Sequence, residues 1–428
     1  MKQSSSLPSL ELRNASTLAT PLGRAARRGR EQGEILRIHG AALRAENGLI
    51  VFAGTEADYR GRYSGHPAEI SIDATGSTVL PGLVDSHTHP VWAGDRGPEI
   101  GRRLAGESYA AIAADGGGIN ATVRATRAAP TAELADLLRQ RLARMSAHGA
   151  TTVEAKSGYG LTVADEIRSL EILAEAARDP ELPRLVPTLL AAHEIPPEFR
   201  ANRTEWVRAI TDEIVPEVAR RGLARFCDVF CDEGVFTVDE SRAILEAGRR
   251  AGLGLRIHAD ELARSGGSFL ASEMRAASAD HLLRIGDEEV AALARSGTIA
   301  TILPGTAWWM RSKPAPARAL IAAGVPVAVA SDSNPGTCLT ESLPAAAAHA
   351  CLDSGLSVEE TLTAITLNAA ASLGLAGETG SLEPGKAADV IWIDAPDDRH
   401  LIYHWGVNLV AGVVERGRLI ARGRGSTS

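Results

Sequence analysis

Four side chains in this sequence have the chemistry of metal ligands. His87 and His89, in PGLVDSHTH, lie two positions apart at the end of an apolar run, so the pleat of a strand would point both imidazoles to one side. His258 ends the run LGLRIH, and Asp332 ends the run VPVAVASD. Three neutral imidazoles and one carboxylate suit one divalent ion, zinc or iron, and leave a position for water. Two surface histidines would give the same His-x-His pattern, but the two further ligands at strand ends favour a metal site.

Two more polar residues end or follow these runs and could take part in catalysis. A divalent ion lowers the pKa of bound water from ~15.7 towards ~7, so hydrolysis is the predicted reaction. His281, in SADH, is expected to contact the water or the developing oxyanion, the alternative being a buried structural histidine. Glu261, in HADE, is expected to carry a proton between water and substrate, the alternative being a solvated loop acid.

The elements that must position these residues repeat along the chain. From about residue 77 to residue 329, short β-branched runs end at polar residues and alternate with alanine-rich, charged segments, which predicts an α/β fold with a (β/α)₈ TIM-like barrel. The predicted outer helices cover residues 131–147, 164–177, 238–251, 287–295 and 315–323. The predicted strands end in VLPGLVDSH, TTVEAKSG, LVPTLLAAHE, RFCDVFCDE, LGLRIHADE, AASADH, TIATILPG and VPVAVASDS. Because such barrels build their sites at the C-terminal ends of strands, we expect the terminal polar residues to converge.

The two ends of the chain differ from the middle. Short alternating strands separated by glycine, such as GLIVFAG and ADVIWID, predict a small β-sandwich domain that is discontinuous, because its parts precede and follow the barrel. The expected division is residues 1–76 for the first part of the sandwich, 77–375 for the barrel hydrolase domain and 376–428 for the second part.

Composition narrows the class of protein. With 428 residues, 45% of them apolar, the chain can bury a large core, and its formal net charge of -8 argues against a nucleic-acid partner and for a small-molecule one. Its four cysteines are too few for a disulfide framework, which favours a reducing cytoplasm, and Cys227 and Cys231 are expected to fill the core. The sequence has neither the apolar core of a secretory signal nor an apolar run of ~18 residues, so no membrane association is expected. The basic residues 23–30 are expected to form a solvated loop.

Several motifs resemble those of known hydrolases. PGLVDSHTHP, IHADE, SADHLL and ASDSNPGT, in that order, resemble the signature of the amidohydrolase superfamily. HTHPVWAGDR, GGGI at residues 116–119, EAKSGYGL, AAHEIPPEF, CDEGVF and TILPGT are similar to motifs of its imidazolonepropionase family, and TGSLEPGKAADVIWID resembles the return into the β-domain. This resemblance implies hydrolytic ring opening of 4-imidazolone-5-propanoate to N-formimidoyl-L-glutamate in histidine degradation, and a homodimer.

The resemblance also implies roles for individual residues. It implies metal ligation by His87, His89, His258 and Asp332, a place for His281 near the reacting carbonyl, and substrate contacts from Arg96, Tyr159, His193, Glu261, Asn334, Gly336 and Thr337. A guanidinium suits the propionate tail of such a substrate. Trp92 and the bulky run of residues 307–310 depart from the family pattern and could reshape a pocket wall. The alternatives are a deaminase of the same superfamily acting on a nucleobase-like ring, and a metal-free binding or scaffold protein.

Overall fold

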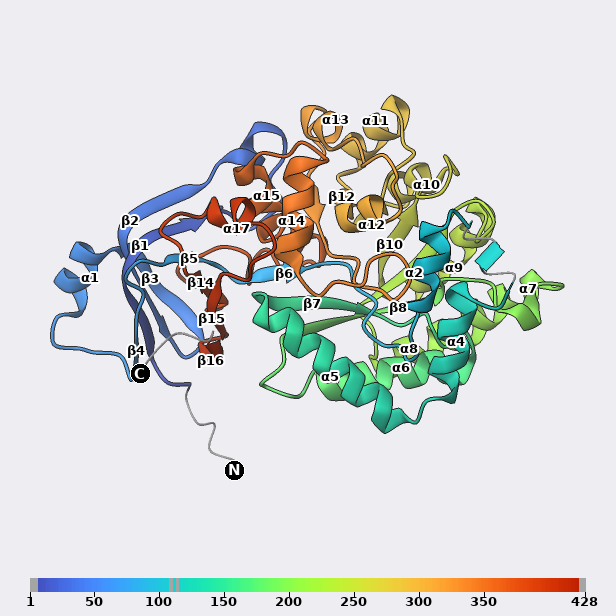
Figure 1. Ribbon diagram of the computed structural model, residues 1–428, viewed down its shortest axis with the longest axis horizontal. Helices are drawn as coiled ribbons and strands as arrows, with labels where there is room; N and C mark the ends of the chain where they lie inside the picture. Colours follow the sequence, from blue (N-terminus) through green and yellow to red (C-terminus); the bar gives the residue numbers. More distant parts are fainter. Residues whose placement is uncertain (1–6, 108–110, 113–114, 423–428) are drawn as a thin grey trace.

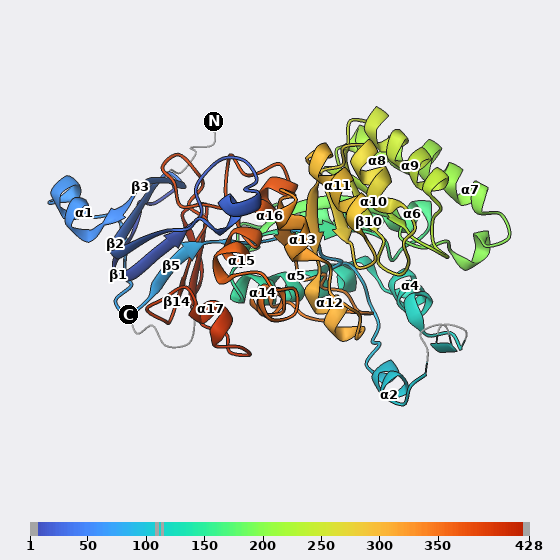
Figure 2. The ribbon, with the colours of Figure 1, turned by 90° about the horizontal axis from the view of Figure 1, so that it is seen from above.

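The computed structural model describes residues 7–107, 111–112 and 115–422, and Figures 1 and 2 show their arrangement. The strands of these residues form two eight-stranded sheets. One sheet is parallel and forms a barrel with helices around it. The other is formed by strands from both ends of the chain, drawn in blue and red in Figure 1.

The parallel sheet confirms the predicted barrel. Its strands follow the chain order, and each pairs in parallel with the next. The first and last strands meet just beyond their ends, where the amide of Asp332 donates to the carbonyl of His87 at 3.0 Å and that of His89 to Ser333 at 2.9 Å. The ring therefore closes at three of the predicted metal ligands. The strands are β6 (Leu83–Asp85), β7 (Ala150–Lys156), β8 (Arg184–Ala192), β9 (Phe226–Cys231), β10 (Gly254–Ala259), β11 (Ser278–His281), β12 (Ile299–Ile302) and β13 (Val327–Val329).

The run VLPGLVDSH, predicted as one strand, forms two. β5 (Thr78–Pro81) belongs to the other sheet, and β6 begins the barrel after Gly82. A Cβ at Gly82 would lie 2.2 Å from Oγ1 of Thr151, so only glycine fits where the chain passes from one sheet to the other.

The five predicted outer helices are present with bounds within two residues of those expected. They are α5 (Thr131–Ala147), α6 (Val163–Ala176), α9 (Val238–Arg250), α11 (Asp287–Ser296) and α13 (Ala317–Ala322). Helix α5 buries Leu134, Leu138 and Leu142, which lie four residues apart on one face. Thr237 and Glu240 form a reciprocal capping box that begins α9.

Further helices lie between and after the barrel strands. They are α2 (Pro98–Leu104), α4 (Gly118–Ala128), η2 (Pro197–Phe199), α7 (Arg203–Arg208), the π-helical turn η3 (Ala209–Ile214), α8 (Val215–Arg221), α10 (Gly267–Glu273), α12 (Pro304–Trp309), α14 (Leu343–Leu352), α15 (Val358–Ala364) and α16 (Leu367–Ser372). Helices α2 and α4 both belong to the long connection between β6 and β7, and Figure 2 shows them on the same side of the barrel.

The second sheet forms the small β-sandwich from both chain ends. β14 pairs antiparallel with β5, so residues 390–393 lie directly beside residues 78–81. Leu12, Leu43, Val390 and Trp392 are buried in its core. The domain boundaries at residues 76 and 375 stay a prediction. The elements of this part are β1 (Leu10–Thr20), η1 (Gly29–Gly33), β2 (Leu36–Glu46), β3 (Leu49–Thr55), α1 (Glu56–Tyr63), β4 (Ile70–Asp73), β14 (Val390–Ile393), α17 (His400–Tyr403), β15 (Val410–Glu415) and β16 (Arg418–Arg422).

Three smaller expectations can be compared with the structure. Cys227 and Cys231 lie in strand β9, where both thiols are buried in the core. Of residues 23–30, which were expected to form a solvated loop, residues 23–28 form an irregular, exposed or half-exposed segment, and residues 29 and 30 begin the 3₁₀ helix η1. Within the described part of the chain, no helix has both the length and the apolar character needed to cross a membrane.

Candidate active site

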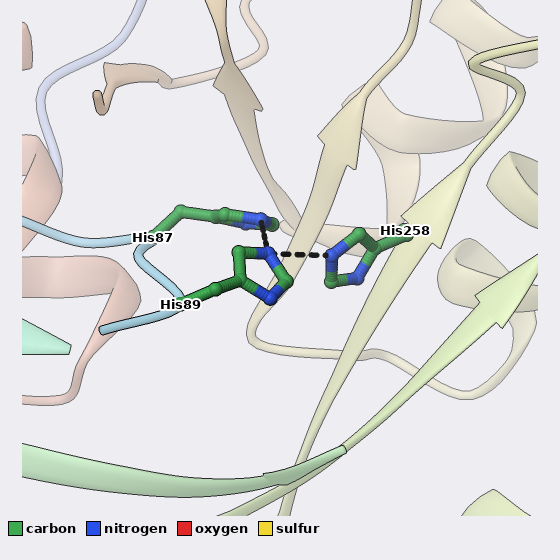
Figure 3. A group of neighbouring side chains, drawn as sticks. All are labelled: His87, His89 and His258. Carbon is green, nitrogen blue, oxygen red and sulfur yellow. Dashed lines mark hydrogen bonds between the residues drawn. The ribbon is translucent and has the colours of Figure 1, made fainter. Parts of the chain in front are cut away.

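The segment after β6 places two histidines on one side of the chain. Thr88 lies between them and is turned the other way, since its hydroxyl donates to the carbonyl of Glu154 at 2.6 Å. His87 and His89 consequently point together toward His258, at the end of β10 (Figure 3). The alternation of a pleated segment thus produces the predicted convergence.

The ligand atoms have the spacing of a metal site. The Nε2 atom of His89 lies 3.3 Å from Nε2 of His87 and 3.5 Å from Nε2 of His258. Oδ1 of Asp332 lies 3.4 Å from Nε2 of both His87 and His89. Ligand atoms bound at 2.0–2.2 Å to a tetrahedral zinc ion lie roughly 3.4 Å apart. All four side chains are buried, and their donor atoms suit one divalent ion. The three histidines form one group of possible ligands, and His87 and Asp332 form a second group with His281.

Buried carboxylates determine which nitrogen of His87 and His258, two of the predicted ligands, faces the centre of the site. Nδ1 of His87 lies 2.7 Å from Asp280, and Nδ1 of His258 lies 3.1 Å from Asp228. Because each Nδ1 donates its proton to a carboxylate, the lone pair of Nε2 is directed toward the common centre. Burial alone would raise the pKa of Asp280, but the charge of Arg256 and the hydrogen bond from His87 outweigh it and hold that pKa far below its usual value.

Glu261 lies at the mouth of the barrel because its loop is fixed by hydrogen bonds. Asp232 accepts the backbone amides of residues 261, 262 and 263 at 2.7 to 3.1 Å, which turns the loop after β10 back over the barrel. The Glu261 side chain is buried, with Oε2 3.5 Å from Nε2 of His281, so it is not the solvated loop acid of the alternative interpretation. Burial and the nearby charge of Asp332 raise the pKa of Glu261 to about 8.

A cavity of about 210 Å³ lies above the ligands. Every substrate contact implied by the resemblance lines it: Arg96, Tyr159, His193, Glu261, Asn334, Gly336 and Thr337, together with His281. Trp92 is buried under the guanidinium of Arg141, and Trp308 and Trp309 are exposed and do not line this cavity. Of the bulky departures from the family pattern, Met310 alone is among the lining residues of the described chain, so the expected change of pocket wall is confined to it.

The predicted contact residues differ in what they can offer a ligand. Nδ1 of His193 donates to the carbonyl of Gly158 at 2.9 Å, and its ring stacks on His89 with 5.0 Å between centroids. Burial lowers the pKa of His193 to about 3, so this ring is neutral. Asn334 shapes its own loop, because its side-chain oxygen accepts the amides of Gly336 and Thr337 at 2.8 Å.

The sequence of this chain is similar to those of known protein families. A model described as the amidohydrolase family matches residues 92–402. An imidazolonepropionase from Symbiobacterium thermophilum is 48% identical over 396 residues, which are 92% of this chain and 93% of the relative. The imidazolonepropionase of Geobacillus kaustophilus is 47% identical and covers 90% of each chain. The chain belongs to the imidazolonepropionase family.

Solved structures with the same fold include more distantly related enzymes. An adenosine deaminase from Xanthomonas campestris with bound zinc is 18% identical, with a TM-score of 0.70 over 96% of this chain and 92% of that one. Atrazine chlorohydrolase from Arthrobacter aurescens, complexed with zinc, is 18% identical with a TM-score of 0.67 and covers 96% and 95%. At this level of identity, the likeness supports the shared fold alone.

The motifs did not predict the buried ion pairs inside the barrel of this imidazolonepropionase-family member. Nζ of Lys156 lies 2.7 Å from Asp228 and 2.8 Å from Glu154, and Nη2 of Arg256 lies 3.1 Å from Asp280. All five are fully buried below the ligand histidines. The available signal was the presence of charged residues within otherwise apolar runs, where burial without a partner would be costly.

The pocket of this imidazolonepropionase-family chain also has an apolar side that the motifs did not predict. Besides Met310, the additional lining residues are Ile119, Glu194, Phe230, Val235 and Leu262. Most of them are apolar, which suits one face of a planar ring.

Proposed function

We propose that this protein hydrolyses 4-imidazolone-5-propanoate to N-formimidoyl-L-glutamate in histidine degradation, using one divalent ion, zinc or iron. The main support is a cluster of four possible ligand side chains beneath a cavity of about 210 Å³, in a chain of this family; His89 Nε2 lies 3.3–3.5 Å from the nearest atoms of the other three. His87, His89, His258 and Asp332 would hold the ion. When bound, a divalent ion lowers the pKa of a water ligand towards ~7 and supplies a nucleophile at neutral pH.

Glu261 is the proposed proton carrier. Its buried carboxyl faces the cavity beside His281, and its raised pKa of about 8 suits a group that both accepts and returns a proton near neutral pH. Glu261 takes a proton from the attacking water as the oxygen bonds to the ring carbonyl carbon. It returns the proton to the ring nitrogen as the carbon–nitrogen bond breaks. The former carbonyl becomes a carboxylic acid, which loses the second proton of the water to solvent and leaves as a carboxylate.

His281 and the remaining lining residues hold the substrate and stabilise charge. His281 is placed to donate toward the developing oxyanion, and the loss of one such donor typically costs about 3 kcal/mol of transition-state stabilisation. Tyr159 and neutral His193 lie side by side, with ring centroids 5.2 Å apart, and contact the ring of the substrate. Arg96 binds its propionate, since a guanidinium matches a carboxylate in shape and charge.

The test is an ultraviolet assay of imidazolone loss with identification of the product. Formation of N-formimidoyl-L-glutamate supports the proposal, whereas ammonia released from a nucleobase-like ring would support the deaminase alternative. Glu261→Gln should abolish turnover, and Glu415→Gln is the control, because Glu415 is a buried acid in strand β15 of the other sheet, away from the cavity.

We further propose that the protein works in the cytoplasm as a homodimer with a small-molecule substrate and no nucleic-acid partner. All four cysteines are free thiols, which agrees with a reducing compartment. Sedimentation equilibrium should give twice the chain mass of 44.9 kDa, and a single chain mass at micromolar concentration would contradict the dimer.

A further inference from the structure

Arg96, the proposed partner of the propionate, is held by a second buried residue. Nε and Nη2 of Arg96 both donate to the carboxylate of Glu99, at 3.1 and 2.9 Å. Each residue is only 9% exposed, and Glu99 lies in the first turn of α2. Such a bidentate pair fixes the plane of the guanidinium as well as its position.

The ion pair determines which edge of Arg96 a ligand can meet. A guanidinium carries its five N–H groups in one plane, and Glu99 occupies the edge formed by Nε and Nη2. A carboxylate that enters the cavity can therefore not form a bidentate contact at this edge. On its other side, Nη1 lies against the backbone of Gly336, where a Cβ would be 2.5 Å away. Arg96 is thus confined between Glu99 and the loop that follows Asp332.

Glu99 also fixes a wall of the cavity through the GGGI segment at residues 116–119. Its Oε1 accepts the amide of Gly118, the first residue of α4, at 2.9 Å. A Cβ at Gly117 would lie 3.1 Å from the same oxygen and 2.8 Å from Cγ2 of Ile112, so a side chain there would disturb the contact. Ile119, which follows Gly118, lines the cavity. The carboxylate of Glu99 consequently positions both the guanidinium of Arg96 and the segment that carries Ile119, an apolar residue of the pocket wall.

The charge state of Glu99 agrees with this arrangement. Burial alone would raise its pKa, but the hydrogen bonds and charge of Arg96 outweigh burial and leave the pKa of Glu99 below its ordinary value. The carboxylate is therefore ionised at neutral pH, and the pair is formed before any ligand arrives. Such preorganisation reduces the cost of ordering a long side chain when a ligand binds.

We propose that Glu99 is a positioning residue that fixes the orientation in which the guanidinium of Arg96 meets the carboxylate of the substrate, and so determines the affinity for carboxylate-bearing imidazolones. The inference rests on the proposed function and adds a specificity determinant to it. Glu99 takes no part in the ring opening itself.

The experiment compares Glu99→Gln with the wild-type protein on two substrates, 4-imidazolone-5-propanoate and the matching imidazolone with a 5-ethyl group in place of the propionate. Glutamine keeps an oxygen for the amide of Gly118 but loses the charge that holds Arg96. We expect KM for the propanoate to rise about 10-fold or more with kcat within about 3-fold, and kcat/KM for the ethyl compound to be unchanged. Glu99→Asp keeps the charge with a shorter reach and should give an intermediate KM, which also tests the proposal if Glu99→Gln folds poorly.

Two controls separate positioning from a merely structural role. Glu107→Gln removes another acidic partner of an arginine from the same region, the one bound by Arg102 at the protein surface, and should leave both kinetic constants unchanged. In an Arg96→Ala background, Glu99→Gln should raise KM no further, because the residue acts through Arg96.

Equal losses on both substrates, or a KM effect that persists without Arg96, would overturn the inference. If the proposed function itself were wrong, the wild-type protein would fail to open 4-imidazolone-5-propanoate, which is a distinct result.

Discussion

The contact between His87 and Asp280 allows a quantitative prediction about metal affinity. The Asp280 carboxylate lies 2.7 Å from Nδ1 of His87 and 3.1 Å from Nη2 of Arg256, and it is fully buried. Asp280→Asn keeps the size of the side chain but removes the charge that balances Arg256 and that orients the imidazole. Loss of a partner that orients a ligand histidine typically weakens metal binding 10- to 100-fold. The metal dissociation constant should therefore rise by this factor, or about 1.4–2.8 kcal/mol.

Competition with a chelator of known affinity, followed by elemental analysis of the protein, measures this dissociation constant. At saturating metal, Asp280→Asn should recover most of its turnover, because the ligand set itself is intact. Asp228→Asn should behave in the same way through His258, whose Nδ1 lies 3.1 Å from Asp228. Glu415→Gln is the control, since Glu415 is a buried acid in strand β15 of the other sheet and should leave metal affinity unchanged. A folded Asp280→Asn protein with wild-type metal affinity would refute the reasoning.

Three further predictions concern the cavity and the thiols. Glu261→Gln should retain its metal and lose turnover by about 100-fold or more, and a variant with normal turnover by the imidazolone assay would exclude Glu261 as the proton carrier. Gly336→Ala should raise KM for the propanoate substrate, because the new Cβ would lie 2.5 Å from Nη1 of Arg96 and displace the guanidinium. Steady-state kinetics measures this KM, and an unchanged value would contradict the proposed contact between Arg96 and the propionate. Burial raises the pKa of the Cys338 thiol far above its usual value. At pH 8 the native protein should therefore resist alkylation of Cys338 by iodoacetamide, while the unfolded chain reacts. Mass spectrometry measures the labelling, and rapid labelling of Cys338 in the native protein would contradict its burial.

Local sequence patterns were sufficient for the barrel and failed where the fold depends on distant pairing. Helix α5 begins and ends at the predicted residues, because its leucines repeat with helical spacing. The run VLPGLVDSH reads as one apolar strand, yet Pro81 and Leu83 belong to different sheets. That division depends on β14, more than 300 residues later, which pairs with β5. No local signal reveals such a partner.

For the site too, sequence patterns predicted features at strand ends but not contacts between distant segments. The convergence of the proposed metal ligands could be predicted, because His258 and Asp332 end apolar runs and the ends of parallel strands meet. Asp280 and Asp228 could not be assigned their partners, since their contacts cross between barrel strands that are distant in sequence. The role inferred for Glu99 also depends on geometry, because a spacing of three residues from Arg96 does not specify a bidentate ion pair.

Metal content measured together with ring-opening activity tests the central claim most directly. We predict about one zinc or iron ion per chain, loss of N-formimidoyl-L-glutamate formation on chelation, and recovery in proportion to the ion restored, up to one equivalent. His258→Ala should bind no stoichiometric ion and show no turnover. Full ring-opening activity in protein that elemental analysis shows to be free of metal would contradict the account.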